Sequence, residues 1–305
     1  MREVKNQAQW DSFFMQCERP YLSQSWVYGE SKRAEKWFPK HFAFEYDEQV
    51  VAICMVLERH ILGINAISRI FRGPLFLKNI TSKDMRIQVM KNLRNRWKYF
   101  TNGLLFIAPA LDSSSENIEI IRMARFWRWT SYKWHSSLIK LNRDEKDMRK
   151  ALGSKWKNRL NSAEGSLVLN ISSNVQEVEW MLKRYVENMK EKKFSGPSIE
   201  FLKELYRTDP DNFIVLQALF ENQPVAGYII MKQGPSAEIY IGWVGPVGRQ
   251  FNAGNFLFWN SSIVMKQRGC RLLDLGGFSI EDRYGRFKRG MNGDEYELSG
   301  EYICF

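Results

Sequence analysis

Hydrophobic and polar positions in the first half of the chain repeat with the period of a helix and then with that of strands. Residues 23–38 predict a helix with Ser23 or Ser25 as its N-cap. Three runs rich in strand-forming residues follow, at 40–47, 49–60 and 65–76. The first two predict a hairpin. The rest of this half predicts helix 82–100, strand 102–111, helix 115–127 and strand 135–142.

The second half has a similar succession of patterns. It predicts a polar helical stretch at 143–165, a strand at 166–172, helices at 174–194 and 197–207, three antiparallel strands within 212–245, a helix at 253–269 and a strand at 270–277. The order helix, three strands, helix, strand therefore occurs once in each half. This order predicts an α+β fold with two similar domains, at residues 1–142 and 143–305, each a mixed, mostly antiparallel sheet flanked by helices.

The composition is that of a globular protein, with 44% hydrophobic and 26% charged residues among 305. No apolar run is long enough to span a membrane, and the N-terminus lacks the pattern of a secretory signal, so we expect a cytoplasmic location. The four cysteines have no CxxC spacing and there are only three histidines. We therefore expect free thiols and no metal site.

The formal net charge of +11 is large for a chain of this length. Such a field attracts nucleic acid, anionic lipid headgroups or phosphorylated small molecules, and it does not choose among them. A non-catalytic module that binds RNA or lipid is one interpretation of the charge. From the same net charge we also expect peripheral contact with a membrane.

One basic segment is a candidate nucleic-acid contact. The stretch RKALGSKWKNRLN at 149–161 contains five basic residues, no acidic residue and one tryptophan. Along a helix, its cations could follow a phosphate backbone while the tryptophan stacks on a base, and a solvated basic face is the alternative. The candidates for tRNA binding are Lys155, Trp156, Lys157 and Arg159.

A second basic segment lies near the C-terminus. DRYGRFKRGMNG at 282–293 alternates aromatic and basic residues and then breaks into glycines. It predicts either a basic surface turn or a loop that handles an anionic substrate, with Tyr284 as a candidate substrate contact. Glycines at 285, 290 and 293 would let the backbone approach a ligand closely.

Five motifs along the chain carry a family resemblance. They are QSWVYGESK (24–32), FRGPLF (71–76), KWKNRLNSAEG (155–165), FLFWNSSIVMKQRGCRLLDLGG (256–277) and YGRFKRGMNG (284–293). In this order they resemble the Fem family of non-ribosomal aminoacyl transferases, which build peptidoglycan cross-bridges, and related acyltransferases. The resemblance implies two tandem acetyltransferase-like (GNAT-type) domains, an aminoacyl-tRNA donor, no cofactor and a monomeric enzyme.

The resemblance also implies roles for single residues. The family's phenylalanine–lysine pair carries over onto Phe287 and Lys288, where a fixed ammonium would stabilise the tetrahedral oxyanion of aminoacyl transfer. Lys32 matches a lysine that contacts the acceptor's phosphates, and Trp26 lies on the same predicted helix. Tyr240 matches an aromatic residue beside the substrate channel. Arg72 is a further substrate-binding candidate, with a structural ion pair as the alternative.

Acceptor and donor stay open at this point. The segment FSGPSIEFLKEL (194–205) lacks the arginine that the family places near the helix after the domain linker, and Ala108 replaces its acidic residue before a proline. The donor alternative is acyl-CoA, whose pyrophosphate lies on a glycine-rich loop in acetyltransferases. Aligned from Gln250, that loop has Ala253 at its first glycine position. We therefore predict aminoacyl transfer to an amine of a peptidoglycan-type precursor or peptide. The alternative is acyl-CoA-dependent N-acylation of a polysaccharide, lipid or small-molecule amine.

Overall fold

The structure is a computed structural model that describes residues 1–305 except 79, 81, 98–101, 280, 282 and 305. The chain divides into two units. Unit 1 contains Met1–Trp134 and the C-terminal segment Tyr296–Phe305, and unit 2 contains His135–Glu295. Within the described residues, no helix is both long and apolar enough to cross a bilayer.

Unit 1 is built on a mixed sheet. Its strands are β1 (Arg2–Glu3), β2 (Phe38–Tyr46), β3 (Gln49–Ile61), β4 (Ile64–Phe71), β5 (Leu75–Phe76), β6 (Leu104–Ala108), β7 (Trp127–Thr130) and β15 (Glu301–Cys304). They lie in the order β1-β2-β3-β4-β6-β15-β7, with β5 beside β3. All described pairs are antiparallel except β4 with β6, because α3 carries the chain back between these two strands.

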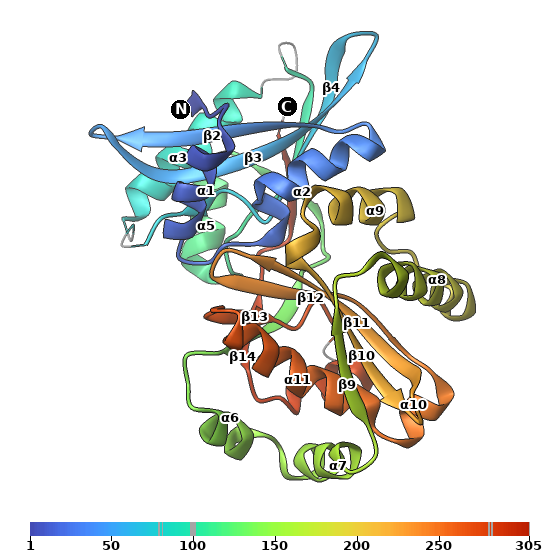
Figure 1. The fold of residues 1–305 in the computed structure, drawn as a ribbon. Coiled ribbons are helices and arrows are strands. Elements are labelled where there is room, and N and C mark those ends of the chain that lie inside the picture. The colour runs from blue at the N-terminus through green and yellow to red at the C-terminus, as the bar shows by residue number, and fades with distance from the viewer. Residues whose placement is uncertain (79, 81, 98–101, 280, 282, 305) are drawn as a thin grey trace. The chain divides into compact units, whose positions relative to one another are not determined.

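Helices cover the sheet of unit 1 (Figure 1). They are α1 (Gln7–Gln16), α2 (Trp26–Ser31), α3 (Lys83–Arg96) and α5 (Ser115–Met123), with 3-10 turns at Leu22–Gln24 and Lys32–Glu35. Helices α3 and α5 begin at serine N-caps and bury aliphatic side chains such as Met90 and Ile120 against the sheet. The helix predicted over 23–38 is instead α2 between two 3-10 turns, and Ser25 is its N-cap.

Unit 2 has a second mixed sheet. Its strands are β8 (His135–Lys140), β9 (Val168–Ser172), β10 (Phe213–Phe220), β11 (Gln223–Gln233), β12 (Ser236–Val244), β13 (Leu272–Asp274) and β14 (Asp294–Glu297). They lie in the order β14-β8-β13-β12-β11-β10-β9. Among the pairs whose direction is described, β12 with β13 is parallel.

Helices of unit 2 pack on this sheet. They are α6 (Glu145–Ala151), α7 (Ser154–Glu164), α8 (Val175–Lys192), α9 (Ile199–Thr208), α10 (Pro246–Gln250), α11 (Ala253–Gln267) and α12 (Arg283–Arg289), with a 3-10 turn at Pro210–Asn212. Helices α7 and α11 share one core with inward residues of β10–β12. Helix α8 approaches β11 at Gly227, where a Cβ would lie 2.7 Å from the Trp180 ring. The fold class predicted for each half, a mixed sheet flanked by helices, is confirmed.

The two units exchange strands along the chain. Strand β7 ends unit 1, and the chain then forms β8, which lies between β13 and β14 in the sheet of unit 2. Strand β14 in turn is followed by β15, which lies between β6 and β7 in the sheet of unit 1. The units therefore end at other residues than the predicted domains 1–142 and 143–305, and those domain limits stay a prediction.

Candidate active site in unit 2

The segment 283–293 is mainly a short helix rather than the turn expected from its glycines. Helix α12 places Arg283 and Arg286 on one side, with Gly290 directly after its end, while Gly285 and Lys288 point inward. A Cβ on Gly285 would clash with the carbonyl oxygen of Ser279, so only glycine allows α12 to lie this close to the preceding segment.

We expect Gly285→Ala to lower the free energy of unfolding by about 1–3 kcal/mol, because the added methyl group must displace a backbone carbonyl. Gly165→Ala is the matched control, since its Cβ would lie 3.6 Å from the nearest oxygen, that of Ser162. The control should change stability by less than about 0.5 kcal/mol. Urea denaturation of both variants checks this, and equal stabilities would contradict the packing described here.

Lys288 is a buried cation, with only 2% of its surface exposed. Its Nζ donates to the carbonyl oxygens of Gly276 at 2.8 Å and Gly277 at 3.2 Å. The Tyr284 ring lies 4.5 Å from Nζ and the Phe278 ring 5.6 Å. The sequence suggested Phe287 as the apolar wall beside this lysine, but the rings recorded against Nζ are those of Tyr284 and Phe278.

The surroundings of Lys288 are shaped by an irregularity of β12. Ile229 pairs with Ile241 and Ile230 with Ile239, so Tyr240 is the extra residue of a β-bulge. Strands β12 and β13 pair only as far as Glu238 and Asp274, and Gly276 then approaches Ile239, whose oxygen would lie 2.7 Å from a Cβ there. Lys288 contacts this same glycine. The Tyr240 ring is half-buried and packs edge-on against Phe201.

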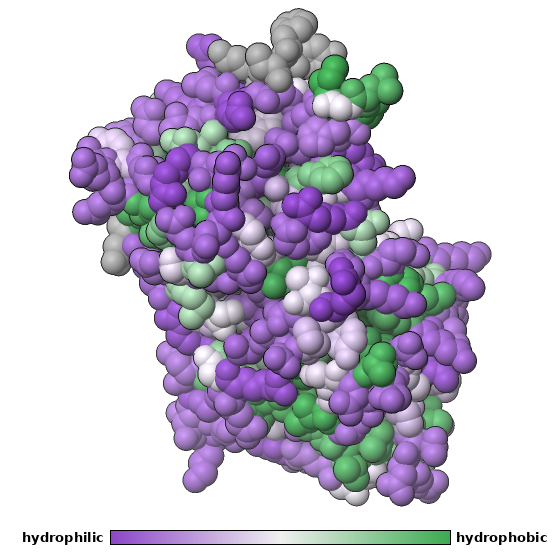
Figure 2. All heavy atoms as spheres, turned by 45° about the horizontal axis from the view of Figure 1, so that its top comes forward, coloured by the Kyte–Doolittle hydropathy of each residue, from purple (hydrophilic) through white to green (hydrophobic). Residues whose placement is uncertain are grey.

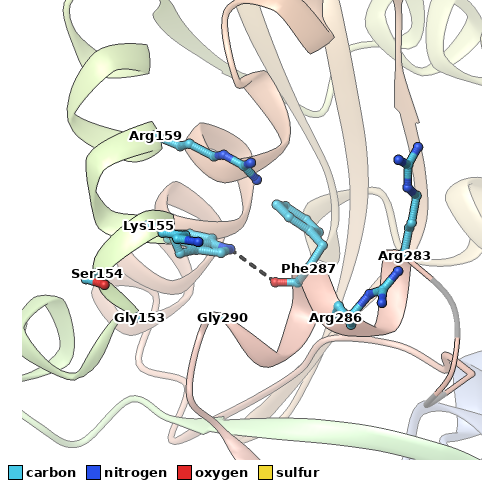
Figure 3. A pocket seen from close by; sticks show the side chains of 9 residues that line it. Gly153, Ser154, Lys155, Arg159, Arg283, Arg286, Phe287 and Gly290 are labelled. Carbon is cyan, nitrogen blue, oxygen red and sulfur yellow. Dashed lines mark hydrogen bonds between the residues drawn. The ribbon is translucent and has the colours of Figure 1, made fainter.

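A cavity of about 720 Å³ opens on the other side of α12. Its lining combines the start of α7 with α12: Gly153, Ser154, Lys155, Trp156, Arg159, Arg283, Arg286, Phe287 and Gly290. Figure 3 shows Arg159 extending toward the Phe287 ring from α7, with Arg283 and Arg286 on the opposite wall. We call this cavity the basic pocket, because its described lining contains four cations and no carboxylate.

The four cations of the basic pocket are not neutralised within the described part of the chain. None of Lys155, Arg159, Arg283 and Arg286 forms an ion pair with a carboxylate there. Four cations around one cavity, with no described carboxylate paired to them, repel one another and favour an anionic ligand. The pocket thus joins the two basic segments that the sequence singled out.

Trp156 has a different place from the one predicted. Its ring is 5% exposed, stacks on Phe287 at 6.1 Å between centroids, and donates from Nε1 to the Phe287 carbonyl at 3.1 Å. It is therefore not free to stack on a base, and it holds α7 against α12 instead. The helical period explains this, because Trp156, Leu160 and Ala163 face the core while Lys155 and Arg159 face outward.

The predicted basic helix over 149–161 is two helices, α6 and α7, separated at Leu152 and Gly153. Arg149 lies on α6 and forms an ion pair with Glu164, donating at 2.7 Å. Lys157 is absent from the described lining of the basic pocket. Of the basic residues predicted to bind tRNA, Lys155 and Arg159 are the two that the pocket brings together.

Comparisons with known proteins bear on this unit. The family described as acetyltransferase (GNAT) domain matches residues 146–289. This match includes the β12 bulge, Lys288 and all of the described lining of the basic pocket except Gly290, and it confirms the prediction of an acyltransferase. No curated protein sequence matches the chain.

Solved structures share the fold over nearly the whole chain. FemX aligns with a TM-score of 0.82 at 11% identity, covering 99% of this chain and 97% of FemX. L-PGS from Bacillus licheniformis aligns with a TM-score of 0.59 at 11% identity, covering 99% and 92%. A tandem GNAT protein from the clavulanic acid biosynthesis pathway aligns at 0.57 and 8% identity, covering 98% and 94%. The resemblance to Fem-type and GNAT-fold acyltransferases is confirmed at the level of the fold.

The loop before α11 contains a feature that the sequence analysis missed. Aligned from Arg249 instead of Gln250, Asn252 occupies the first glycine position and Gly254 the second. Asn252 has φ 55° and ψ 34°, the left-handed conformation that glycine usually supplies. The signal was available, because asparagine is the residue that most readily replaces glycine there. The backbone conformation of this loop therefore resembles a phosphate-binding loop more closely than its sequence indicated.

A buried tyrosine faces this same loop. Tyr228 is 2% exposed, and its hydroxyl would lie 3.7 Å from a Cβ on Gly254. Burial raises the pKa of Tyr228 well above its ordinary value, so it is a neutral hydrogen-bond donor. Phe287 also contacts Gly254, at 3.3 Å from the same Cβ position. The start of α11 and the basic pocket therefore meet at Phe287.

The remaining predicted site residues lie in unit 1. Lys32 forms an ion pair with Glu35 at 2.8 Å, and Trp26 stacks on His41 at 4.1 Å between ring centroids. Burial lowers the pKa of His41 to about 3, so this ring is neutral. Arg72 packs over the Trp134 ring at 4.0 Å. The φ of Arg72 is 50°, in the left-handed region.

Proposed function

We propose that this protein transfers an aminoacyl group from aminoacyl-tRNA to an amine of a peptidoglycan-type cell-envelope precursor or of a peptide. The observation that carries the proposal is the basic pocket, where four cations form no ion pair within the described residues and two of them lie on the helix that carries Lys288. Every such cation raises the affinity for a polyanionic donor, since each phosphate that it neutralises releases condensed counterions. The fold shared with FemX supports the choice of an aminoacyl group.

In the proposed reaction, the acceptor amine attacks the ester carbonyl of the donor. A C–N bond forms, the C–O bond to the ribose breaks, and the proton lost by the amine ends on the ribose hydroxyl. The ammonium of Lys288 stabilises the negative charge that develops on the carbonyl oxygen. The bulge at Tyr240 interrupts the regular pairing of β12 near this lysine. Attack by the amine needs no acyl-enzyme, in keeping with the four cysteines, which are all buried.

The basic pocket and Lys288 occupy different sides of α12, and Tyr284 lies between them. Tyr284 stacks on Phe287 at 6.3 Å and contacts Nζ of Lys288. We assign phosphate binding to Lys155, Arg159, Arg283 and Arg286, and positioning of the donor's end to Tyr284. For unit 1 we propose a second GNAT-type domain in tandem, with Lys32, Trp26 and Arg72 contacting the acceptor, in a cytoplasmic monomer.

An acyl-CoA donor is the second candidate, and one observation favours it. Asn252, Gly254 and Tyr228 surround the first turn of α11, where backbone N–H groups and the helix dipole favour a pyrophosphate. In this case the basic pocket would hold the remaining phosphate of the cofactor. The acceptor would then be an amine of a polysaccharide, lipid or small molecule.

Titration with charged tRNA and with CoA esters at two salt concentrations separates the donors. We expect tRNA binding that weakens steeply with salt, because several cations contact phosphates, and weak CoA binding. Uncharged tRNA measures how much of the affinity depends on the aminoacyl group. Micromolar CoA binding without salt-sensitive tRNA binding would overturn the tRNA proposal in favour of the second candidate.

A further inference from the structure

The hairpin β3–β4 continues beyond the strands that flank it. Strand β2 begins at Phe38, which pairs with Glu58, and strand β6 begins at Leu104, which pairs with Ile67. Residues 59–66 therefore form a two-stranded tip with no strand on either side in the described sheet. Figure 1 shows this tip at the upper right, near the label β4.

The tip exposes large aliphatic side chains to water. Leu62 is 97% exposed, Ile64 72% and Ile61 58%. Figure 2 shows a hydrophobic patch at the upper right of the molecule, where the hairpin ends. Phe38 extends the apolar surface toward the sheet, since it is 40% exposed and its ring contacts His60. Exposed apolar residues grouped in this way mark an interaction site.

Cations surround the base of this tip. Arg59 packs over Trp37 at 4.8 Å, and Lys36 is exposed next to that tryptophan. Arg96 is the last residue of helix α3, and its charge acts on the carboxyl group of Glu58 at the base of the tip. Asn102 connects the helix end to the hairpin, because it contacts Arg96 and its carbonyl accepts from Asn65 at 2.8 Å. Two acidic residues lie near these cations. Glu58 is 9% exposed and burial raises its pKa, while Glu35 forms an ion pair with Lys32 at 2.8 Å.

We propose that the β3–β4 tip docks this protein on an anionic lipid bilayer, with Ile61, Leu62 and Ile64 inserted among the acyl chains. The cations Lys36, Arg59 and Arg96 would then lie at the level of the headgroups. An apolar tip with basic residues behind it matches the two layers of a bilayer surface. The net charge of +11 adds long-range attraction to anionic lipids.

The shape of the tip favours a bilayer over a protein partner. A protein groove must match the side chains that enter it, and the contact is then usually a broad patch. Here a few aliphatic residues project from a narrow two-stranded ribbon. A narrow apolar tip can insert into a fluid bilayer without shape complementarity. The affinity of the tip for the bilayer depends on the buried apolar area and on charge.

Vesicle co-sedimentation tests the proposal. The full chain should bind vesicles of phosphatidylcholine mixed with phosphatidylglycerol more tightly than vesicles of phosphatidylcholine alone. Leu62→Asp should weaken binding to the mixed vesicles by about 10-fold or more, because it places a charge in the acyl layer. Val168→Asp in unit 2 is the matched control, since Val168 is 64% exposed and lies outside the tip. Unchanged binding of Leu62→Asp, or an equal loss in the control, would overturn the proposal.

A fluorescent label measures insertion directly. The four native cysteines are buried, so Leu62→Cys can be labelled selectively with an environment-sensitive dye. Its emission should shift to shorter wavelength with the mixed vesicles, while a label at Val168→Cys should not shift. A label at position 62 that stays in water while the protein binds would overturn the insertion. Neither measurement needs a donor or an acceptor, so the outcome is independent of the proposed transferase activity.

Discussion

Replacing Lys288 with methionine is expected to lower the turnover rate by about 100-fold or more at saturating substrates. The ammonium lies near the bulge of β12, and methionine keeps the length of the side chain without its charge. The substitution removes two hydrogen bonds to the carbonyls of Gly276 and Gly277, and the Ser136 hydroxyl still contacts the first of them at 2.9 Å. We therefore expect a loss of about 1–3 kcal/mol in stability and a folded protein.

Two controls keep this test decisive. Arg289→Met removes the neighbouring cation, whose Nε lies 3.0 Å from Glu295 in a partly exposed ion pair, and it should leave turnover nearly unchanged. Circular dichroism and urea denaturation establish that each variant is folded at the assay temperature. If folded Lys288→Met keeps wild-type turnover, the lysine is structural. If both variants lose turnover equally, the loss comes from a disturbance of helix α12 and not from removal of the Lys288 charge.

The fold of each half could be predicted because local patterns decide it. Strands β10, β11 and β12 alternate with turn residues, and the serines at 82, 114 and 198 each cap the helix that follows them. The exchange of β8 and β15 could not be predicted from such patterns. Both strands fit either sheet by their own hydrophobicity, and their place depends on contacts between residues far apart in the chain, such as Tyr302 with Ile107.

The candidate site was predicted by residue type but not by geometry. Counting cations along 149–161 treated its basic residues alike, yet the helical period separates Lys155 and Arg159 from Lys157 and turns Trp156 inward. Arg283 and Arg286 were not singled out, because the glycines around them favoured a turn. Their spacing of three residues on a helix is what aligns them on one wall of the basic pocket.

Neutralising the basic pocket is the change with the largest expected effect on donor binding. Arg159→Gln combined with Arg286→Gln removes one cation from each wall of the pocket and keeps polar side chains of similar shape. We expect the affinity for aminoacyl-tRNA to fall, and the slope of log affinity against log salt to decrease by about 1.4–1.8. Fluorescence anisotropy with labelled tRNA over a series of salt concentrations gives both quantities.

The matched control removes the same charge elsewhere. This control is Lys150→Gln combined with Lys157→Gln. Both lysines lie within the same basic stretch but outside the described lining of the pocket. If a general positive field attracts the tRNA, both double variants will lose affinity equally and the pocket has no special part. If the pocket binds the phosphates, the control keeps nearly the wild-type salt slope, because counterion release counts only phosphates that are in contact with the protein. Turnover at saturating tRNA should stay near wild type in the pocket variant, since Lys288 and its carbonyl partners are untouched.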